Sequence, residues 1–293
     1  MKTITIVSGK GGTGKTSIIS SFAALASPTA LADCDVDAAD LHLMLHPDIK
    51  KINPFSGAKV AEIDMEKCSS CDLCHDLCRF EAIDIVNMSY KVDHIACEGC
   101  GVCAWFCPEQ AIELVDEPSG EWYISETAYG PMVHAKLGIA AENSGRLVTI
   151  VRNFAKGIGE TRDIEYMLVD GSPGIGCPVI ASITGVDFAL IVTEPTLSGQ
   201  HDMERIAELT AHFDIPTRIC INKWDINKEV TKNIEEWGER TGNKIIGKVR
   251  FDNIVTEAMV QGIPVVEYSK NGISGDIESL WSRLKKELNS SIV

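Results

Sequence analysis

The chain has 293 residues, 45% of them hydrophobic, which is enough to bury the core of one large domain that carries a smaller insert. Its formal net charge of −15 repels phosphate backbones and anionic lipids, so we expect no nucleic-acid partner and no polybasic membrane attachment. No apolar run approaches the ~18 residues that span a bilayer, and the first residues enter a strand pattern without the apolar region of a signal peptide. We therefore expect a cytoplasmic protein with no membrane span.

Short apolar runs of the kind that form buried parallel strands alternate along the chain with helical patterns. Strands are predicted over residues 3–8, 29–34, 166–170, 188–193 and 218–222. Helices are predicted over residues 16–26, 199–213, 228–241 and 275–288. This alternation is typical of an α/β fold with a doubly wound, mostly parallel sheet.

The segment between the first predicted strand and the first predicted helix reads Gly9-Lys10-Gly11-Gly12-Thr13-Gly14-Lys15-Thr16. This is the spacing of a phosphate-binding loop, in which glycines let backbone N–H groups turn toward phosphate oxygens. Lys15 would supply a positive charge to the β- and γ-phosphates, and the Thr16 hydroxyl would bind Mg²⁺. We expect these residues and the following Ser17 to bind a nucleoside triphosphate.

The second lysine of this loop, Lys10, makes it resemble the deviant Walker A motif of the MinD/ParA superfamily, which includes the nitrogenase iron protein and the Mrp-type cluster carriers. The resemblance implies a P-loop ATPase that dimerises on binding ATP, as a homodimer or as a heterodimer with a paralogue. It implies that Lys10 reaches across the dimer interface. Lys10 and Lys15 are then expected to be catalytic.

The segment Asp33-Cys34-Asp35, at the end of the second predicted strand, resembles switch I of this family. The resemblance implies that Asp35 is the catalytic carboxylate, which orients or activates the attacking water, and that Asp33 has a Mg²⁺-binding or structural role. Asp37 and Asp40 have weaker claims, because a run of acidic residues after a strand is also typical of a solvated turn.

The α/β rhythm stops between about residues 58 and 118, which hold thirteen Asp and Glu, four Lys and Arg, and eight of the eleven cysteines. The segment repeats itself with an offset of 29 residues, because Cys78-Arg79-Phe80-Glu81-Ala82-Ile83 matches Cys107-Pro108-Glu109-Gln110-Ala111-Ile112. We therefore predict a P-loop domain over 1–57 and 119–293, and an inserted domain over 58–118.

The eight cysteines of the insert form two runs with the same spacing, and metal ligation is favoured over disulfides in a chain without an export signal. Three close cysteines and a more distant fourth favour 4Fe–4S clusters of the bacterial ferredoxin type over zinc, in an arrangement where the fourth cysteine ligates the other cluster. The predicted ligands are Cys68, Cys71, Cys74 and Cys107 for one cluster, and Cys97, Cys100, Cys103 and Cys78 for the other.

Two later segments also resemble the family. Asp170-Gly171-Ser172-Pro173-Gly174 resembles switch II, which implies that Asp170 holds Mg²⁺ through water and that Gly174 turns toward the γ-phosphate. Asn222-Lys223-Trp224-Asp225 fits the guanine-reading motif, so this segment alone leaves GTP open. The resemblance implies ATP instead, with Asn222 contacting the adenine.

Three cysteines lie outside the insert. Cys34 and Cys220 sit in apolar strands and are expected to be buried as small hydrophobic residues. Cys177 follows Asp170 at the spacing at which the nitrogenase iron protein carries a cluster ligand, so it is a candidate ligand across a dimer, although a packing role is favoured. On the last predicted helix, a single apolar face favours packing on the sheet over a membrane anchor of the MinD kind.

These features lead to one main hypothesis, an ATP-hydrolysing iron–sulfur protein that couples nucleotide-driven dimer switching to electron transfer through two 4Fe–4S clusters. Its cofactors would be the two clusters, ATP and Mg²⁺, and it would need a redox partner protein. The alternative is an ATPase that assembles or carries iron–sulfur clusters. A positioning ATPase of the MinD/ParA type is less favoured, because the acidic charge suits neither DNA nor a membrane surface.

Overall fold

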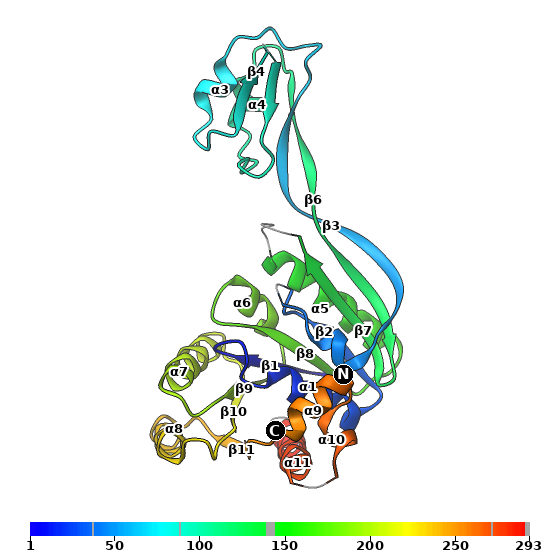
Figure 1. Cartoon of the computed structure of the whole chain (residues 1–293), viewed down its shortest axis with the longest axis vertical. Coiled ribbons are helices and arrows are strands. Elements are labelled where there is room, and N and C mark those ends of the chain that lie inside the picture. The colour runs from blue at the N-terminus through cyan, green and yellow to red at the C-terminus, as the bar shows by residue number, and fades with distance from the viewer. Residues whose placement is uncertain (37, 88, 139–143, 271, 291–293) are drawn as a thin grey trace. The chain divides into compact units, whose positions relative to one another are not determined.

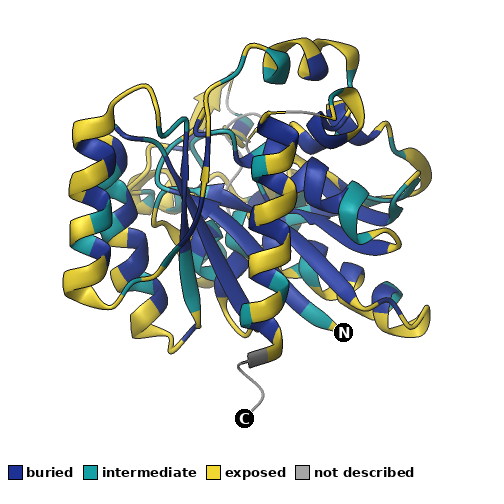
Figure 2. Cartoon of the chain, turned by 90° about the horizontal axis from the view of Figure 1, so that it is seen from below, coloured by how far each residue is buried: buried dark blue, intermediate teal, exposed yellow. Residues whose placement is uncertain are grey.

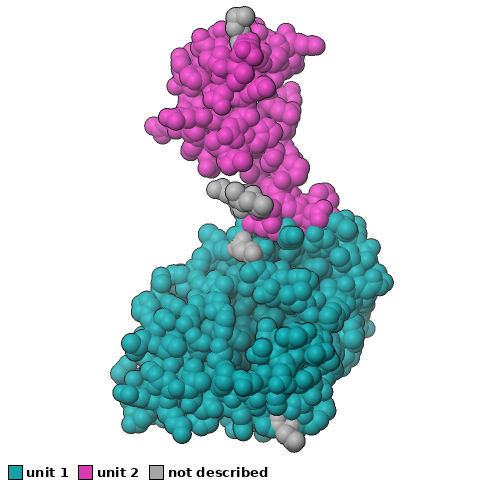
Figure 3. Space-filling model, viewed as in Figure 1, with its two compact units in different colours: residues 1–52, 122–136, 144–293 teal, residues 53–121, 137–143 magenta. Residues whose placement is uncertain are grey.

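The structure is a computed structural model that describes residues 1–36, 38–87, 89–138, 144–270 and 272–290. The chain divides into two compact units (Figure 3). Unit 1 comprises residues 1–52, 122–136 and 144–293, and unit 2 comprises residues 53–121 and 137–143. The boundaries predicted from the sequence, 57/58 and 118/119, fall inside two long strands, β3 (Asp48–Ile63) and β6 (Ile112–Thr127).

The elements of unit 1 follow the predicted alternation (Figure 1). Each predicted strand and helix is present, with ends that differ by a few residues, so the mostly parallel α/β fold is confirmed. The strands are β1 (Lys2–Ser8), β2 (Thr29–Asp33), β7 (Gly130–Leu137), β8 (Tyr166–Pro173), β9 (Phe188–Thr193), β10 (Thr217–Asn222) and β11 (Ile245–Val249). The helices are α1 (Lys15–Ala26), α2 (Leu41–Leu45), α5 (Ser144–Thr161), α6 (Cys177–Ile183), α7 (Leu197–His212), α8 (Lys228–Thr241), α9 (Ile254–Gln261), α10 (Val265–Tyr268) and α11 (Ile273–Ser290).

The strand order of the main sheet is β11-β10-β9-β1-β8-β2-β7-β6-β3. The register pairs β1 with β8 and β9, β2 with β7 and β8, and β10 with β9 and β11, all in parallel. Each of these junctions brings carboxyl ends of strands to one edge of the sheet, which is where ligands bind in open α/β folds.

The core forms on both faces of the sheet because successive side chains of a strand point to opposite sides. On β9, Leu190 packs into the cluster with α1, α10 and α11, and Ile191 packs into the cluster with α6, α7 and α8. The strands are therefore buried between two layers of helices (Figure 2). Cys34 and Cys220 are fully buried in this core, as predicted.

The terminal helix α11 covers the sheet, as the sequence predicted. Its apolar face, Ile277, Leu280, Trp281, Leu284 and Leu288, is at most 4% exposed and belongs to the core. Among the described residues, the structure contains no helix with both the length and the apolar character that a membrane span requires.

Unit 2 is built from two similar halves. Its elements besides the long strands are α3 (Leu73–Leu77), β4 (Ile83–Val86), β5 (Ser89–Val92) and α4 (Val102–Phe106). The unusual left-handed backbone positions recur with the offset of the sequence repeat, in the pairs Ser70 and Gly99, Asp72 and Gly101, and Glu81 and Gln110. The sequence repeat is therefore also a repeat of backbone conformation.

Candidate functional site

The glycine-rich loop connects β1 to α1. Gly14, the residue before the helix, has a left-handed backbone with φ of 89°. A Cβ atom at this position would lie 2.2 Å from Nδ2 of Asn222, so only glycine fits. Because glycine has no side chain to cap the helix, the first N–H groups of α1 are available to bind an anion.

Lys15, the first residue of α1, is surrounded by acidic side chains. Its Nζ lies 2.6 Å from Oδ1 of Asp170 and 3.3 Å from Oδ2 of Asp35. Asp33 adjoins the group, because it is the register partner of Asp170 in the sheet. Within the described residues, the buried Oδ2 of Asp33 has no hydrogen-bond partner. One ammonium among three carboxylates leaves an excess of negative charge and an unpaired oxygen, and both fit a divalent cation such as Mg²⁺.

The pKa values reflect this crowding of charges. Burial raises the pKa of Asp33 well above its usual range, and Asp170 raises it further. Burial also raises the pKa of Asp170, although Lys15 opposes this effect. Burial alone would lower the pKa of Lys15, but the carboxylates of Asp170 and Asp35 outweigh burial and raise it to about 12. The lysine stays protonated at neutral pH. Its single positive charge does not balance the three carboxyl groups around it.

The segment after Asp170 is hydrogen-bonded to the loop and to the end of β2. The N–H of Gly174 donates to the carbonyl of Ser8 at 3.0 Å, and the hydroxyl of Ser172 donates to the carbonyl of Cys34 at 2.6 Å. The N–H of Cys34 donates to the carbonyl of Asp170 at 2.9 Å. The two predicted switches are thus joined to each other, and one of them is joined to the phosphate loop.

A cavity of about 360 Å³ opens beside the loop. Gly9, Asp33 and Asp170 do not line this cavity. Asp170 is connected to it by its ion pair with Lys15, which does line it. Asp40 lines the cavity, whereas Asp37 lies outside the described residues. The predicted residues that line it are Lys10, Gly11, Gly12, Thr13, Gly14, Lys15, Thr16, Ser17, Asp35 and Asn222.

The opposite wall of the cavity was not predicted. It comes from the end of β11, the following loop and α9, none of which carries a recognisable motif. The only available signal is topological, because the loop follows a parallel strand at the edge where ligands bind. The wall includes Arg250, Phe251, Asp252, Val255, Thr256 and Met259.

The segment that fits the guanine-reading motif supports the walls of this cavity. The amide of Asn222 donates to the carbonyl of Thr13 at 2.7 Å, and Lys223 donates to the carbonyl of Gly12 at 2.9 Å. Asp225 lies outside the cavity wall and accepts the N–H of Phe251 at 2.7 Å. One oxygen of this carboxylate is therefore engaged by the backbone, and the preference for ATP over GTP stays a prediction.

Lys10 lines the cavity, but its ammonium is engaged within the chain. Its Nζ lies 2.7 Å from Oε1 of Glu194, in the loop after β9. The Lys10 side chain is 33% exposed, so solvent reaches it.

The eight cysteines of unit 2 line two further cavities. One is lined by Cys68, Cys71, Cys74 and Cys107, and the other by Cys78, Cys97, Cys100 and Cys103. Each cavity takes three cysteines from one run and the fourth from the other, which is the grouping that the spacing predicts. The metal itself stays a prediction.

The fourth cysteine of each run is held in the same way. The N–H of Ala82 donates to Sγ of Cys78 at 3.4 Å, and the N–H of Ala111 donates to Sγ of Cys107 at 3.3 Å. Backbone N–H groups that point at sulfur stabilise thiolates and tune the potential of a bound cluster. Backbone donors directed at sulfur in both halves fit a thiolate-bound group.

Across the described residues, no group of three or more His, Cys, Asp or Glu side chains is arranged to hold a metal ion. A single zinc ion requires its sulfur ligands to converge to about 2.3 Å from one point. The four cysteines of each group line a common cavity.

Cys177 begins α6 and is exposed. It packs near Gly145, where a Cβ atom would lie 3.4 Å from that of Cys177. A role as a ligand in a dimer stays a prediction.

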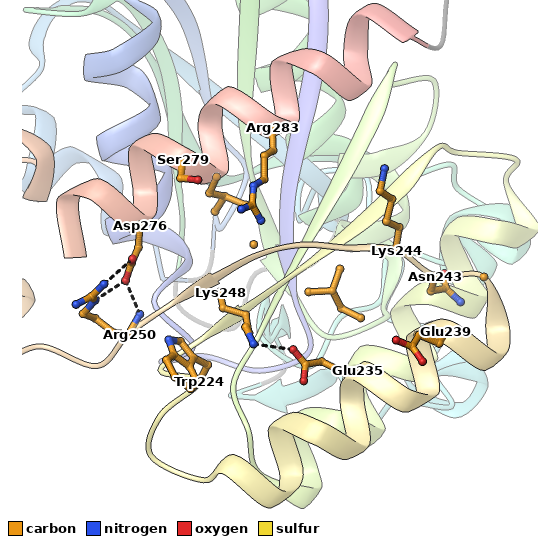
Figure 4. A pocket seen from close by; sticks show the side chains of 15 residues that line it. Trp224, Glu235, Glu239, Asn243, Lys244, Lys248, Arg250, Asp276, Ser279 and Arg283 are labelled. Atoms are coloured by element: carbon orange, nitrogen blue, oxygen red, sulfur yellow. Dashed lines mark hydrogen bonds and ion pairs between the residues drawn. The ribbon is translucent and has the colours of Figure 1, made fainter. Parts of the chain in front are cut away.

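A larger cavity, of about 820 Å³, lies between α8, β11 and α11 (Figure 4). Two pairs of its charged side chains contact each other, Arg250 with Asp276 at 2.6 Å and Lys248 with Glu235 at 2.8 Å. Its wall lacks the glycine-rich loop, so we do not assign it to phosphate binding.

One sequence relative covers nearly the whole chain, and another covers half of it. It is 36% identical to the uncharacterized protein MJ0578 of Methanocaldococcus jannaschii over 97% of this chain and 96% of that protein. It is 25% identical to the septum site-determining protein MinD of Bacillus subtilis over 50% of this chain and 58% of that protein.

Solved structures share the fold. The septum site-determining protein MinD complexed with Mg-ADP, from Pyrococcus horikoshii, has a TM-score of 0.56 and 18% identity, over 97% of this chain and 96% of that chain. The MinC:MinD cell division protein complex of Aquifex aeolicus has a TM-score of 0.59 and 19% identity, over 98% of this chain and 96% of that chain. The CobQ/CobB/MinD/ParA nucleotide binding domain matches residues 4–265. With its glycine-rich loop and acidic pocket, this chain therefore belongs to the MinD/ParA superfamily of P-loop ATPases.

Proposed function

We propose that this ATPase couples its nucleotide state to electron transfer by two 4Fe–4S clusters held in unit 2. The observation that carries the proposal is the division of eight cysteines between two cavities, each combining three cysteines of one run with the fourth of the other. Bacterial two-cluster ferredoxins use this exchange of the fourth ligand. When bound, such clusters would accept and release single electrons.

The cysteine cavities support the assignment by their chemistry. Cys68, Cys71, Cys74 and Cys107 would hold one cluster, and Cys78, Cys97, Cys100 and Cys103 the other. Thiolates are soft ligands that select zinc or iron–sulfur centres over hard cations. Buried apolar side chains such as Ile112 in one cavity and Ile83 in the other would limit solvent access, which also tunes the potential.

On the nucleotide side, each residue has a role that its position supports. Lys15 would exchange its contacts with Asp170 and Asp35 for phosphate oxygens, which would release both carboxylates. Asp170 and Asp33, with the hydroxyl of Thr16, would then hold Mg²⁺ and its waters. Asp35 would orient the attacking water, and Lys10 would contact the phosphates of a second subunit. The dimer is either a homodimer or a heterodimer with a paralogue.

The chain itself links the nucleotide cavity to the cysteines. Asp40 lines the cavity and precedes α2, and β3 begins at Asp48, soon after that helix ends. β3 then runs to Ile63, and the carbonyl of the next residue, Asp64, accepts the N–H of Cys68 at 3.1 Å. The nucleotide cavity and the first cysteine run are thus connected along the chain by α2 and β3, and this is the connection through which the nucleotide state would act on the clusters. Transfer of the electron requires a redox partner protein.

The test is an anaerobic redox titration followed by EPR on the reconstituted full chain, without nucleotide, with Mg-ADP and with a non-hydrolysable ATP analogue. We expect a nucleotide-dependent shift of tens of millivolts, because 30 mV corresponds to ~0.7 kcal/mol for one electron and allosteric couplings are typically ~1–3 kcal/mol. Lys15→Ala is the matched control, which should lose the shift and ATP hydrolysis but keep its iron.

Two outcomes would count against the proposal in different ways. Cluster signals that do not respond to nucleotide would contradict the coupling, while leaving the iron–sulfur assignment intact. If no 4Fe–4S signal appears after reconstitution, the cysteine cavities hold some other group, and the electron-transfer function is wrong.

A further inference from the structure

Glu194 connects two lysines of the nucleotide site. It follows β9 directly, and its side chain is 14% exposed. One carboxylate oxygen, Oε1, lies 2.7 Å from Nζ of Lys10, and the other, Oε2, lies 3.2 Å from Nζ of Lys223. Lys223 also donates to the carbonyl of Gly12, so the carboxylate is anchored to the phosphate loop.

The ammonium of Lys10 has two further hydrogen-bond partners, which follow Glu194 closely in the sequence. It donates to the hydroxyl of Ser198 at 3.1 Å and to that of Thr196 at 3.3 Å, both at the start of α7. Burial alone would raise the pKa of Glu194, but the two lysines outweigh burial and hold the pKa below its usual range. The carboxylate is therefore ionised at neutral pH, and the pair is a charge-assisted hydrogen bond.

The surroundings of Lys10 are open to a second molecule. Its side chain is 33% exposed, and Leu197, between its two hydroxyl partners, is 78% exposed. A second molecule could therefore reach the Lys10 side chain from solvent without displacing a buried side chain at Leu197.

We propose that Glu194 is a positioning residue that holds Lys10 within its own subunit and restrains dimerisation until the lysine is released. The inference rests on the proposed dimer, in which Lys10 binds the phosphates of the nucleotide in a second copy. Only the fraction of subunits with Lys10 released is competent to dimerise, and because both subunits must be released, the apparent affinity of a homodimer falls by the square of that fraction. The phosphates compete with one carboxylate and two hydroxyl groups for the same ammonium.

The test removes the negative charge and keeps the shape, with Glu194→Gln. The dimer dissociation constant would be measured by analytical ultracentrifugation of the full chain with a non-hydrolysable ATP analogue. If about nine in ten subunits hold Lys10, release in both subunits of a homodimer should tighten the dimer by up to roughly a hundredfold. The same substitution in a Lys10→Ala background should change nothing, because Glu194 acts through Lys10. An equal gain in both backgrounds, or no gain with Lys10 present, would overturn the inference.

We call the pairing of Glu194 with Lys10 the latch. Three further variants distinguish its effect on dimerisation from other effects. Ser198→Ala removes one hydroxyl partner of Lys10 and leaves the carboxylate in place, so dimer affinity should rise less, by roughly twofold. If neither Ser198→Ala nor Glu194→Gln raised dimer affinity, the latch would be overturned, even if Glu194→Gln folds poorly. Lys223→Met removes the second lysine and should weaken nucleotide binding without tightening the dimer. Glu235→Gln neutralises the partner of Lys248 elsewhere and should leave dimerisation unchanged.

Failure of the latch is distinguishable from failure of the dimer itself. If Lys10→Ala weakens dimerisation but Glu194→Gln leaves it unchanged, Lys10 acts across the interface and only the latch is wrong. If Lys10→Ala alone leaves the dimer unaffected, Lys10 does not act across an interface, and the proposed dimer and the latch both fail.

Discussion

Two glycines of the phosphate loop differ in what their backbone and surroundings tolerate. Gly14 has a φ of 89°, and a Cβ atom there would lie 2.2 Å from Nδ2 of Asn222. Among the described residues, a Cβ atom at Gly11 would meet no atom within 4 Å, and its φ is not positive. Sequence alone treats the two glycines alike, because both belong to the same motif.

We therefore predict that the two alanine substitutions differ in their effect on the free energy of unfolding. Gly14→Ala should destabilise the nucleotide-free protein by about 2–3 kcal/mol, because it combines left-handed strain with a clash against the amide that braces Thr13. Gly11→Ala should change the free energy of unfolding by less than about 0.5 kcal/mol. Urea unfolding followed by tryptophan fluorescence would measure both, and equal losses would contradict the geometry of the loop.

Three elements, β6, β7 and α2, meet at a buried histidine. His134 on β7 is 7% exposed, and its Nε2 lies 2.9 Å from the hydroxyl of Ser125 on β6. Its ring stacks on Tyr123, with centroids 4.9 Å apart, and faces His42 of α2 at 6.4 Å. Burial lowers the pKa of His134 to about 4, with a smaller effect from His42.

This contact makes stability depend on pH. Below about pH 6.5 the unfolded chain binds a proton at residue 134 that the folded chain does not bind until about pH 4, so stability falls as the pH falls through this window. The loss should be about 2 kcal/mol between pH 7.5 and pH 5, and His134→Gln, which retains an amide for Ser125, should remove most of it. Urea midpoints at the two pH values would test this, with the exposed His201 changed to Gln as the control. If the wild type and His134→Gln lose equal stability, the histidine does not titrate as inferred.

At the scale of the elements, residues of the site that depend on local sequence were predictable, and residues that depend on strand order were not. The loop and the expected grouping of the cysteines follow from local spacing in the sequence, whereas the acids at the ends of β2 and β8 were expected from the resemblance to the MinD/ParA superfamily. β3 was missed because its first five residues are exposed and give no apolar run. Glu194 and Phe251 were missed because their partners depend on which strands are neighbours, and strand order is not written in any one segment.

On the scale of the whole molecule, both cysteine runs line both cavities of unit 2. Under the proposed iron–sulfur assignment, changes in one run should therefore affect the cluster that the other run holds. Cys107→Ser with Cys71→Ser removes two cysteines of the same cavity and, on the proposed assignment, should remove one cluster, about half of the iron. Cys107→Ser with Cys100→Ser removes two cysteines of the same run that line different cavities, and should remove both clusters. Iron and acid-labile sulfide per chain, measured after anaerobic reconstitution, would distinguish them. If the pair from one run lost only one cluster, each run would bind its own metal. The backbone repeat of unit 2 would then be the remnant of two independent sites, and not the frame of one interlocked pair.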